Sequence, residues 1–242
     1  DAVIIFNNTK SIFKNVLTGY VPDIKYERIP ISARKTNIFY RSTPLHYIYG
    51  DLGQQKTNIG KKIKAYAQNS EIITDIEWEY NKKIFKEEWY IKLLNSKVTL
   101  ATECGCKVFD FEPRLTKINA ILKTNPNYTY EQAKKDFNII PMYEACQVSP
   151  KMFEAAKLGT VLIMFEGEYK NIFKANIHYI ELKKDYSNLD EVLEKVKDDV
   201  FLQNMADRTY KDIVESGKYS YKKFIEFVDS IIKEQLNISG YL

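Results

Sequence analysis

The sequence predicts an α/β fold in which a mostly parallel β-sheet carries helices on both faces. Short apolar runs alternate with segments whose apolar residues recur every three or four positions, which is typical of successive strand and helix units. A sharply delimited helical pattern over 149–159 passes directly into the apolar run 160–165. The 242 residues, 45% of them hydrophobic, can form one full core. These observations together predict a Rossmann-like domain.

The strands are predicted from apolar runs with the length of buried strands. These runs cover 2–6, 37–41, 72–76, 98–103, 160–165 and 177–182. The second run ends at the Ser-Thr-Pro sequence 42–44, and the fourth leads into a Cys-Gly-Cys turn. Residues 20–35 contain two prolines and no helical period, so we expect them to form a connector.

The helices are predicted where apolar residues recur with helical spacing, as at Ile59 and Ile63 or at Phe85, Trp89 and Leu93. They are expected over 9–19, 56–67, 81–96, 130–137, 149–159, 188–216 and 220–237. The pattern over 107–143 is the least regular of the chain. No internal repeat interrupts the alternation.

The helix over 149–159 has the clearest boundaries. Ser149 is suited to cap its start, Pro150 to occupy its first turn, and Gly159 to take the left-handed conformation after its end. In an open parallel sheet, ligands bind beyond the carboxyl ends of the strands, and a helix N-terminus there favours an anion. Lys151 opposes the helix dipole in this first turn, which favours an anion nearby. The sequence therefore predicts a phosphate site here.

Three further residues are candidates for the same edge of the sheet. Arg41 ends the second predicted strand and Lys56 begins the next helix, so both could face a diphosphate. Considered singly, each is more often an ordinary exposed cation. Glu154 lies just over one turn into the helix and could accept hydrogen bonds from sugar or ribose hydroxyls, or could be a surface glutamate stabilised by the dipole.

Several familiar sites are not predicted. The sequence has no G-x-G-x-x-G, no P-loop with correct glycine spacing, no G-x-S-x-G and no D-x-D pair. At Asp75 and Glu77 a solvated pair is favoured over a metal site. Three cysteines and two histidines do not provide a convincing zinc site or a closed disulfide framework. We therefore expect neither a metal nor a resident cofactor.

Charge and hydropathy limit the class of protein. The formal net charge is +4 and the charges are interspersed, which favours a solvated lysine-rich surface over a nucleic-acid interface. The longest aliphatic-aromatic run is the five-residue VLIMF at 161–165, far shorter than the ~20 residues of a membrane span. No leader is recognised, so we expect a cytoplasmic protein.

The segment SPKMFEAAKLGTVLI (149–163) resembles the nucleotide-sugar-binding half of GT-B-fold glycosyltransferases of the family-1 and family-4 type. The stretch 165–199 is similar to the continuation in bacterial members, and the resemblance covers roughly residues 37–235. It implies that Arg41 and Lys56 are catalytic residues that grip the donor diphosphate. It further implies donor binding by Glu103, Ser149, Pro150, Lys151, Phe153 and Glu154.

One position departs from that family. Its E-x7-E motif pairs two glutamates eight positions apart, and Glu154 matches the second, but Cys146 occupies the first. Glu144 is two residues early, and Glu103 is the candidate that could stand in for the missing carboxylate.

The resemblance also implies a division of the chain. Residues 1–35 look like a remnant of the amino-terminal, acceptor-side domain and its linker, 36–219 like the Rossmann-like nucleotide-sugar domain, and 220–242 like a helix that crosses back. The chain is then expected to lack most of the acceptor half. Alone, it should bind the donor but turn over poorly.

The expected function is metal-independent transfer of a sugar from a nucleoside-diphosphate sugar to a glycan or lipid-linked acceptor. The full-length protein could then associate peripherally with a membrane, and no nucleic-acid partner is expected. Two alternatives remain: a nucleotide-sugar epimerase on the same fold, and a non-catalytic α/β module with a degenerate site. Nucleotide binding that depends on Arg41 and Glu154 favours an enzyme, whereas no nucleotide binding favours the module.

Overall fold

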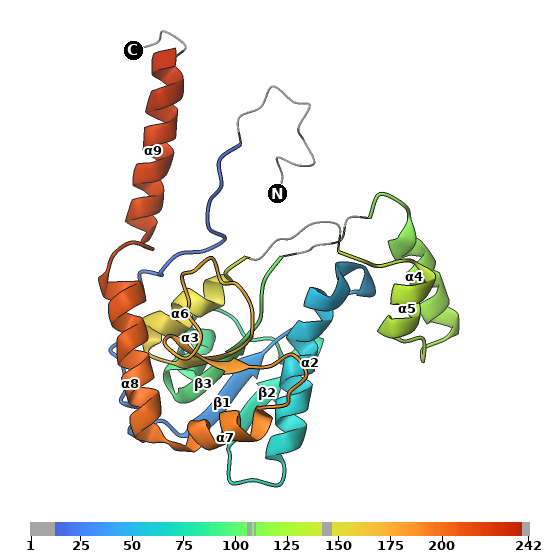
Figure 1. Cartoon of the computed structure of the whole chain (residues 1–242), viewed down its shortest axis with the longest axis horizontal. Coiled ribbons are helices and arrows are strands. Elements are labelled where there is room, and N and C mark those ends of the chain that lie inside the picture. The colour runs from blue at the N-terminus through green and yellow to red at the C-terminus, as the bar shows by residue number, and fades with distance from the viewer. Residues whose placement is uncertain (1–12, 106–107, 109, 142–146, 239–242) are drawn as a thin grey trace.

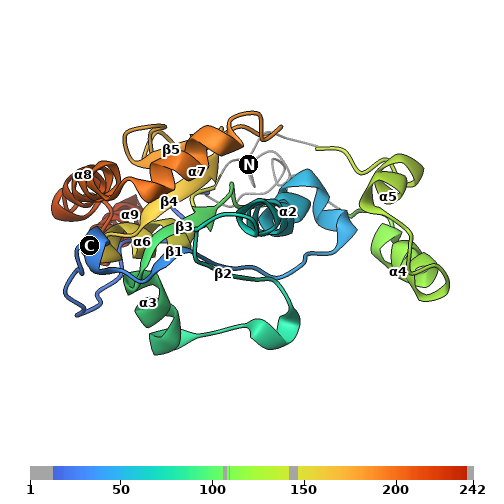
Figure 2. The ribbon, with the colours of Figure 1, turned by 90° about the horizontal axis from the view of Figure 1, so that it is seen from below.

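The computed structural model describes residues 13–105, 108, 110–141 and 147–238. Its centre is a five-stranded, wholly parallel sheet in the order β2-β1-β3-β4-β5 (Figures 1 and 2). The strands are β1 (Thr36–Arg41), β2 (Thr74–Glu77), β3 (Ser96–Ala101), β4 (Val161–Phe165) and β5 (Tyr179–Leu182). The predicted α/β fold is therefore confirmed. The strand predicted at 2–6 lies outside the described residues.

Helices cover both faces of the sheet (Figure 2). They are α2 (Gly50–Ala67), α3 (Lys86–Leu94), α4 (Arg114–Thr124), α5 (Tyr130–Asp136), α6 (Pro150–Leu158), α7 (Leu189–Lys197), α8 (Asp199–Thr209) and α9 (Tyr221–Ile238). Single turns occur at Ile31–Ala33, Tyr47–Tyr49 and Tyr80–Lys82, and a π-helical segment, Tyr210–Glu215, follows α8. The main helices α2 and α7 pack on one face, and α3 and α6 on the other.

The alternation of side chains along β1 accounts for this layering. Ile38 and Tyr40 join the core beneath α2 and α7, whereas Phe39 packs on the opposite face against Leu93 of α3 and Leu158 of α6. Every residue of β4 is buried, because helices cover the sheet on both sides. The continuous apolar run that predicted β4 is a direct consequence of this two-sided burial.

The order of the strands reverses beside β1. The chain passes from β1 through α2 to β2 on one side, and then crosses through α3 to β3 on the other side of β1. Loops from β1 and β3 therefore leave in opposite directions at the carboxyl edge. A crevice at such a reversal is the general ligand position of open α/β sheets.

Two helix predictions need correction at their starts. The stripe that includes Phe85 predicts a helix from residue 81, but α3 begins at Lys86, because Phe85 has an extended backbone (φ −142°) and is 68% exposed. Helix α2 begins at Gly50, earlier than the expected Lys56. The glycines of α2 interrupt the apolar spacing by which a helix is predicted. At Gly60, a Cβ would lie only 3.0 Å from Tyr40 Cδ1. Glycine there allows α2 to approach β1 closely.

The helix predicted over 9–19 is wrong for its described part, because residues 13–19 form no helix. Tertiary contacts hold this segment instead: the Thr18 hydroxyl donates to the Val148 carbonyl, and Gly19 lies against Pro150, where a Cβ would be 2.7 Å from Pro150 Cγ. Contacts with the start of α6 thus override a weak local preference.

Two parts extend beyond the sheet and its helices (Figure 1). Helices α4 and α5, inserted between β3 and α6, form a small cluster around Ile118, Tyr128 and Ala133. Helix α9 extends from the body near the residue 13–20 segment, where Tyr20 contacts the rings of Tyr221 and Phe224. Within the described residues, none of the helices combines the length and apolar character required to cross a membrane.

Candidate functional site

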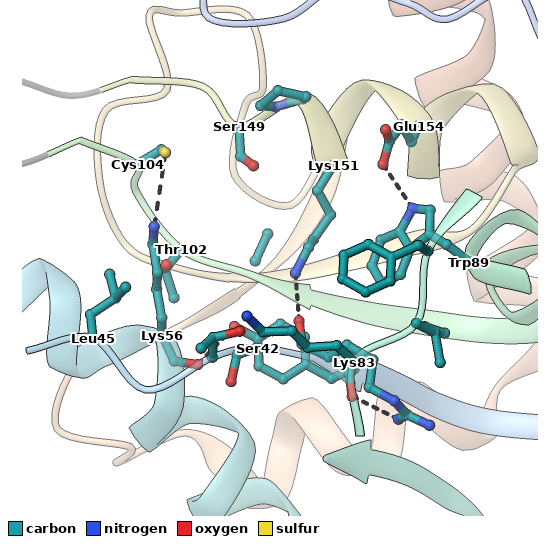
Figure 3. A pocket seen from close by; sticks show the side chains of 17 residues that line it. Ser42, Leu45, Lys56, Lys83, Trp89, Thr102, Cys104, Ser149, Lys151 and Glu154 are labelled. Carbon is teal, nitrogen blue, oxygen red and sulfur yellow. Dashed lines mark hydrogen bonds between the residues drawn. The ribbon is translucent and has the colours of Figure 1, made fainter. Parts of the chain in front are cut away.

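A cavity of about 510 Å³ lies at the carboxyl edge of the sheet where the strand order reverses. It is lined by the ends of β1 and β3 and the start of α6, with Lys56 of α2, Trp89 of α3 and the loop 83–85 (Figure 3). Six of the eight residues predicted for the site lie on its wall: Arg41, Lys56, Ser149, Pro150, Lys151 and Glu154. The structure thus brings together segments that are more than 100 residues apart.

Lys151 occupies the centre of this wall. Its ammonium donates a hydrogen bond to the Arg41 carbonyl at 2.9 Å and lies 4.5 Å from the centre of the Tyr40 ring and 5.2 Å from that of Trp89 (Figure 3). Burial, and after it the nearby charge of Lys56, lowers the pKa of Lys151 to about 8. The site therefore holds a partly desolvated cation that forms no ion pair with a carboxylate of the described residues.

The start of α6 points toward the same space. Ser149 has the extended backbone of a capping residue, but its hydroxyl makes no capping hydrogen bond, so the predicted side-chain cap is wrong. The hydroxyl lines the cavity instead (Figure 3). Pro150 occupies the first turn and Gly159 takes the left-handed conformation (φ 67°), both as predicted. The amide end of the helix is thus not closed by Ser149, and it carries a partial positive charge.

Glu154 faces the cavity one turn further along α6. The indole N–H of Trp89 on α3 donates to its Oε2 at 2.8 Å (Figure 3). Burial raises the pKa of Glu154, and the Trp89 hydrogen bond and the charge of Lys151 oppose this shift. An indole that holds one oxygen leaves the other available to accept hydrogen bonds from a hydroxylated ligand.

Arg41 lines the cavity, but its guanidinium is already engaged. It donates to Asp75 Oδ1 at 2.6 Å and to the carbonyls of Tyr40 and Asp75. Burial tends to raise the pKa of Asp75, but hydrogen bonds from Lys92 and Arg41 outweigh it and hold that pKa below its ordinary value. Arg41 is therefore a fixed part of the wall, and its grip on a diphosphate stays a prediction.

Arg41 and the residue after it each have a buried polar group that lacks a hydrogen-bond partner among the described residues. Arg41 Nε and the Ser42 hydroxyl are both buried and form no hydrogen bond within the described part of the chain. Unpaired buried donors are costly unless a ligand or water satisfies them. Both residues line the cavity, so a ligand bound there could satisfy these two donors.

Lys56 reaches the cavity from α2. Its ammonium lies 4.0 Å from the Cys104 sulfur, and its carbonyl accepts a hydrogen bond from the Tyr40 hydroxyl at 2.8 Å (Figure 3). Cys104 is a free thiol that follows the end of β3. Two lysine side chains from different helices therefore enter one space.

Two predicted residues lie elsewhere. Phe153 is fully buried in the core, against Phe173 and Tyr219, because it lies about 100° around α6 from Glu154. Glu103 is also buried, but it lines a second cavity next to the first. Direct donor contacts by these two residues stay predictions. Cys146 and Glu144, the other positions weighed for the E-x7-E motif, lie outside the described residues.

Sequence reasoning missed other residues of the wall. Ser42 and Thr102 follow the ends of β1 and β3, so the rule that ligands bind at the carboxyl edge could have identified them. No such signal identifies Trp89, because it comes from the middle of a helix that crosses beneath the sheet.

The acidic pair considered for a metal is engaged in ion pairs. Asp75 contacts Arg41 and Lys92, and Glu77 contacts Lys64 at 2.9 Å. Over the part of the chain that the structure describes, no group of three or more His, Cys, Asp or Glu side chains could hold a metal ion.

Comparison with known proteins adds little. No model of a protein family matches the chain, and no curated protein matches it. The crystal structure of TarM, a glycosyltransferase, is similar with a TM-score of 0.40 and 15% sequence identity. The match covers 88% of this chain and 37% of the TarM chain. A likeness this remote does not bear on reaction or ligand, and the α/β, Rossmann-like fold is established by the sheet itself.

Proposed function

We propose that the first cavity binds the diphosphate of a nucleoside-diphosphate sugar and that the chain is the donor-binding part of a glycosyltransferase. One observation carries this proposal: the ammonium groups of Lys56 and Lys151 and the open N-terminus of α6 all face one cavity at the reversal of strand order. Such an arrangement suits an extended dianion better than a neutral ligand.

The positive groups account for the chemistry expected of the leaving group. When the bond between a sugar and a diphosphate breaks, negative charge develops on the diphosphate oxygens. Preorganised cations and amide N–H groups stabilise that charge without any reorganisation. Lys56, Lys151 and the start of α6 would supply this stabilisation from the protein alone, so we propose a transfer that needs no metal.

The carboxylate of Glu154 favours one orientation of the bound ligand. Glu154 is held by Trp89 one turn from the helix start, so hydroxyls of a ribose or of the donor sugar could bind there. The unpaired Ser42 hydroxyl lies on the same wall and could complete the contacts to the phosphates.

We propose that the acceptor is a glycan or a lipid-linked glycan. A domain outside this chain would hold it in place. The chain spans about 37% of the length of TarM, so positioning between two domains would depend on a longer protein. We propose that the nucleotide sugar is a substrate and that no resident cofactor takes part.

Calorimetric titration of the chain with UDP, GDP and ADP tests the proposal. At least one of them should bind, and Lys151→Met should weaken that binding about tenfold or more, because a hydrogen bond to a charged group is lost. Lys157→Met is the matched control, since Lys157 lies on the same helix but does not line the cavity. It should leave the affinity unchanged.

Trp89→Phe tests the contribution of the Glu154 end of the site separately from that of the phosphate end. It keeps an aromatic ring but removes the N–H that holds Glu154, so it should weaken nucleotide binding more than it weakens pyrophosphate binding. The proposal fails if no nucleotide binds, or if Lys151→Met and Lys157→Met have the same effect.

A further inference from the structure

A second cavity of about 390 Å³ lies beside the first, between α2, the end of β3 and the α4–α5 insertion. The two cavities have no lining residue in common. Neighbours in sequence alternate between them: Lys56 and Cys104 line the first, whereas Gln55 and Glu103 line the second. A ligand of the second cavity would therefore make its own contacts.

Glu103 is the unexplained group in this cavity. It is only 7% exposed, and its carboxylate has no hydrogen bond or ion pair within the described residues. Gly167 makes room for it, because a Cβ there would lie 2.5 Å from Glu103 Oε1. The carboxylate oxygens are not among the enclosed unpaired atoms of the described residues, so they reach the cavity, where a ligand that donates hydrogen bonds can bind them in place of water.

The remaining wall identifies the ligand chemistry. The side-chain amides of Gln55 and Asn58 form no hydrogen bond within the described part of the chain, and each can both donate and accept. Tyr49, 43% exposed, adds an aromatic surface. Mixed donors and acceptors beside an aromatic ring match the hydroxyls and the apolar C–H face of a sugar ring.

A cationic ligand fits less well. Lys184 also lines the cavity and would repel it. Two other carboxylates line the cavity. Asp51 is half-exposed and already engaged, since Lys134 contacts it at 2.8 Å and the Tyr130 hydroxyl donates to it. Glu131 is exposed, so solvent screens its charge.

From this combination we infer that the second cavity is a carbohydrate-binding site in which Glu103 accepts hydrogen bonds from the ligand hydroxyls. Binding there does not require a nucleotide. Only the further step, that such a carbohydrate is the acceptor beside the donor, rests on the proposed function.

Ligand-observed NMR titration with a panel of methyl pyranosides, and with putrescine as the cationic probe, tests the inference. At least one pyranoside should bind without nucleotide. Glu103→Gln should weaken its affinity about tenfold or more, since a charged acceptor becomes a neutral one. Glu71→Gln is the control, since Glu71 is exposed and lines neither cavity, and it should leave pyranoside affinity unchanged.

A second variant protects against a folding defect in Glu103→Gln. Gln55→Ala alters a partly exposed helical position and should also weaken pyranoside binding. The inference is overturned if no pyranoside binds, if only putrescine binds, if binding requires nucleotide, or if neither variant changes it. Nucleotide binding without pyranoside binding overturns this inference alone, whereas the reverse result overturns only the proposed function.

Discussion

Lys151 lies in an environment that is unfavourable for a cation, for two separate reasons. A lysine at the start of a helix meets the positive end of the dipole, and here it is also partly buried between Tyr40 and Trp89. Its lowered pKa, about 8, records this unfavourable environment. A bound diphosphate would supply the missing negative charge and raise that pKa again.

The pH dependence of binding follows from this pKa. One pH unit above it, only about a tenth of the ammonium groups stay protonated, so diphosphate affinity should weaken by up to about tenfold between pH 7 and 9. Titration calorimetry at several pH values measures this. Lys151→Met should bind weakly at every pH and lose most of the dependence. An identical pH profile in the variant would contradict the assignment.

The stability of the free protein should respond in the opposite sense. Between about pH 8 and 10.5 the unfolded chain binds the Lys151 proton and the folded chain does not. The free energy of unfolding therefore gains a contribution that grows with pH in this window, and Lys151→Met should lack it. Denaturant unfolding of both proteins across that range gives the difference.

At the scale of elements, α6 supplies one wall of the first cavity, and its two ends differ in structure. Its first turn presents Ser149 and Lys151 to the cavity, whereas its last turn is closed by Gly159. The backbone N–H of Gly159 donates to the Ala156 carbonyl, and that of Thr160 to the Ala155 carbonyl. This closure fixes where the helix stops and β4 begins.

Gly159→Ala should therefore destabilise the fold. A left-handed conformation costs an alanine about 1–2 kcal/mol, and the new Cβ would also lie 3.1 Å from Arg28 Cδ. Gly217→Ala is a matched control, with nearly the same φ (66°) but no atom within 4 Å of the added Cβ. Denaturant unfolding should show a loss for both variants and a larger one for Gly159→Ala. Equal losses would mean that the contact with Arg28 has no effect.

Arg34 connects several of these elements at the amino-terminal edge of the sheet. It is 4% exposed and donates to the carbonyls of Ile29, Ser96 and Leu158 and to the Thr160 hydroxyl. Burial lowers its pKa to about 10. It thus satisfies the carbonyl end of α6 with a buried cation, at the edge of the sheet away from the first cavity.

At the scale of the whole molecule, ligand binding should affect the carboxyl edge of the sheet and spare the insertion. A saturating nucleotide should slow amide hydrogen exchange in the segments 40–45, 101–104 and 149–154, which supply most of the lining of the first cavity, but not in α4 or α5. Exchange mass spectrometry with and without the nucleotide measures this. Protection spread evenly over the chain would contradict a localised site.

The sequence predicts much of this architecture because buried strands and amphipathic helices have local signatures. β4 is recognisable from its own residues, and so are the two ends of α6. The placement of Lys56 and Arg41 at one edge follows from the parallel sheet alone. The failures have different causes: residues 18–19 are held by contacts with Val148 and Pro150, whereas Phe85 matches the helical spacing but is exposed and extended, so the helix starts after it.

Read alone, the residues determined a parallel α/β sheet, a helix with defined ends, and a set of cations at its carboxyl edge. Only the tertiary structure decided that the strand order reverses between β1 and β3, that Asp75 engages Arg41 while no described carboxylate pairs with Lys151, and that Glu103 faces a separate cavity. These features depend on which distant segments meet. Such contacts produce no periodic pattern of apolar residues in the sequence, whereas burial of a strand or of a helix face does.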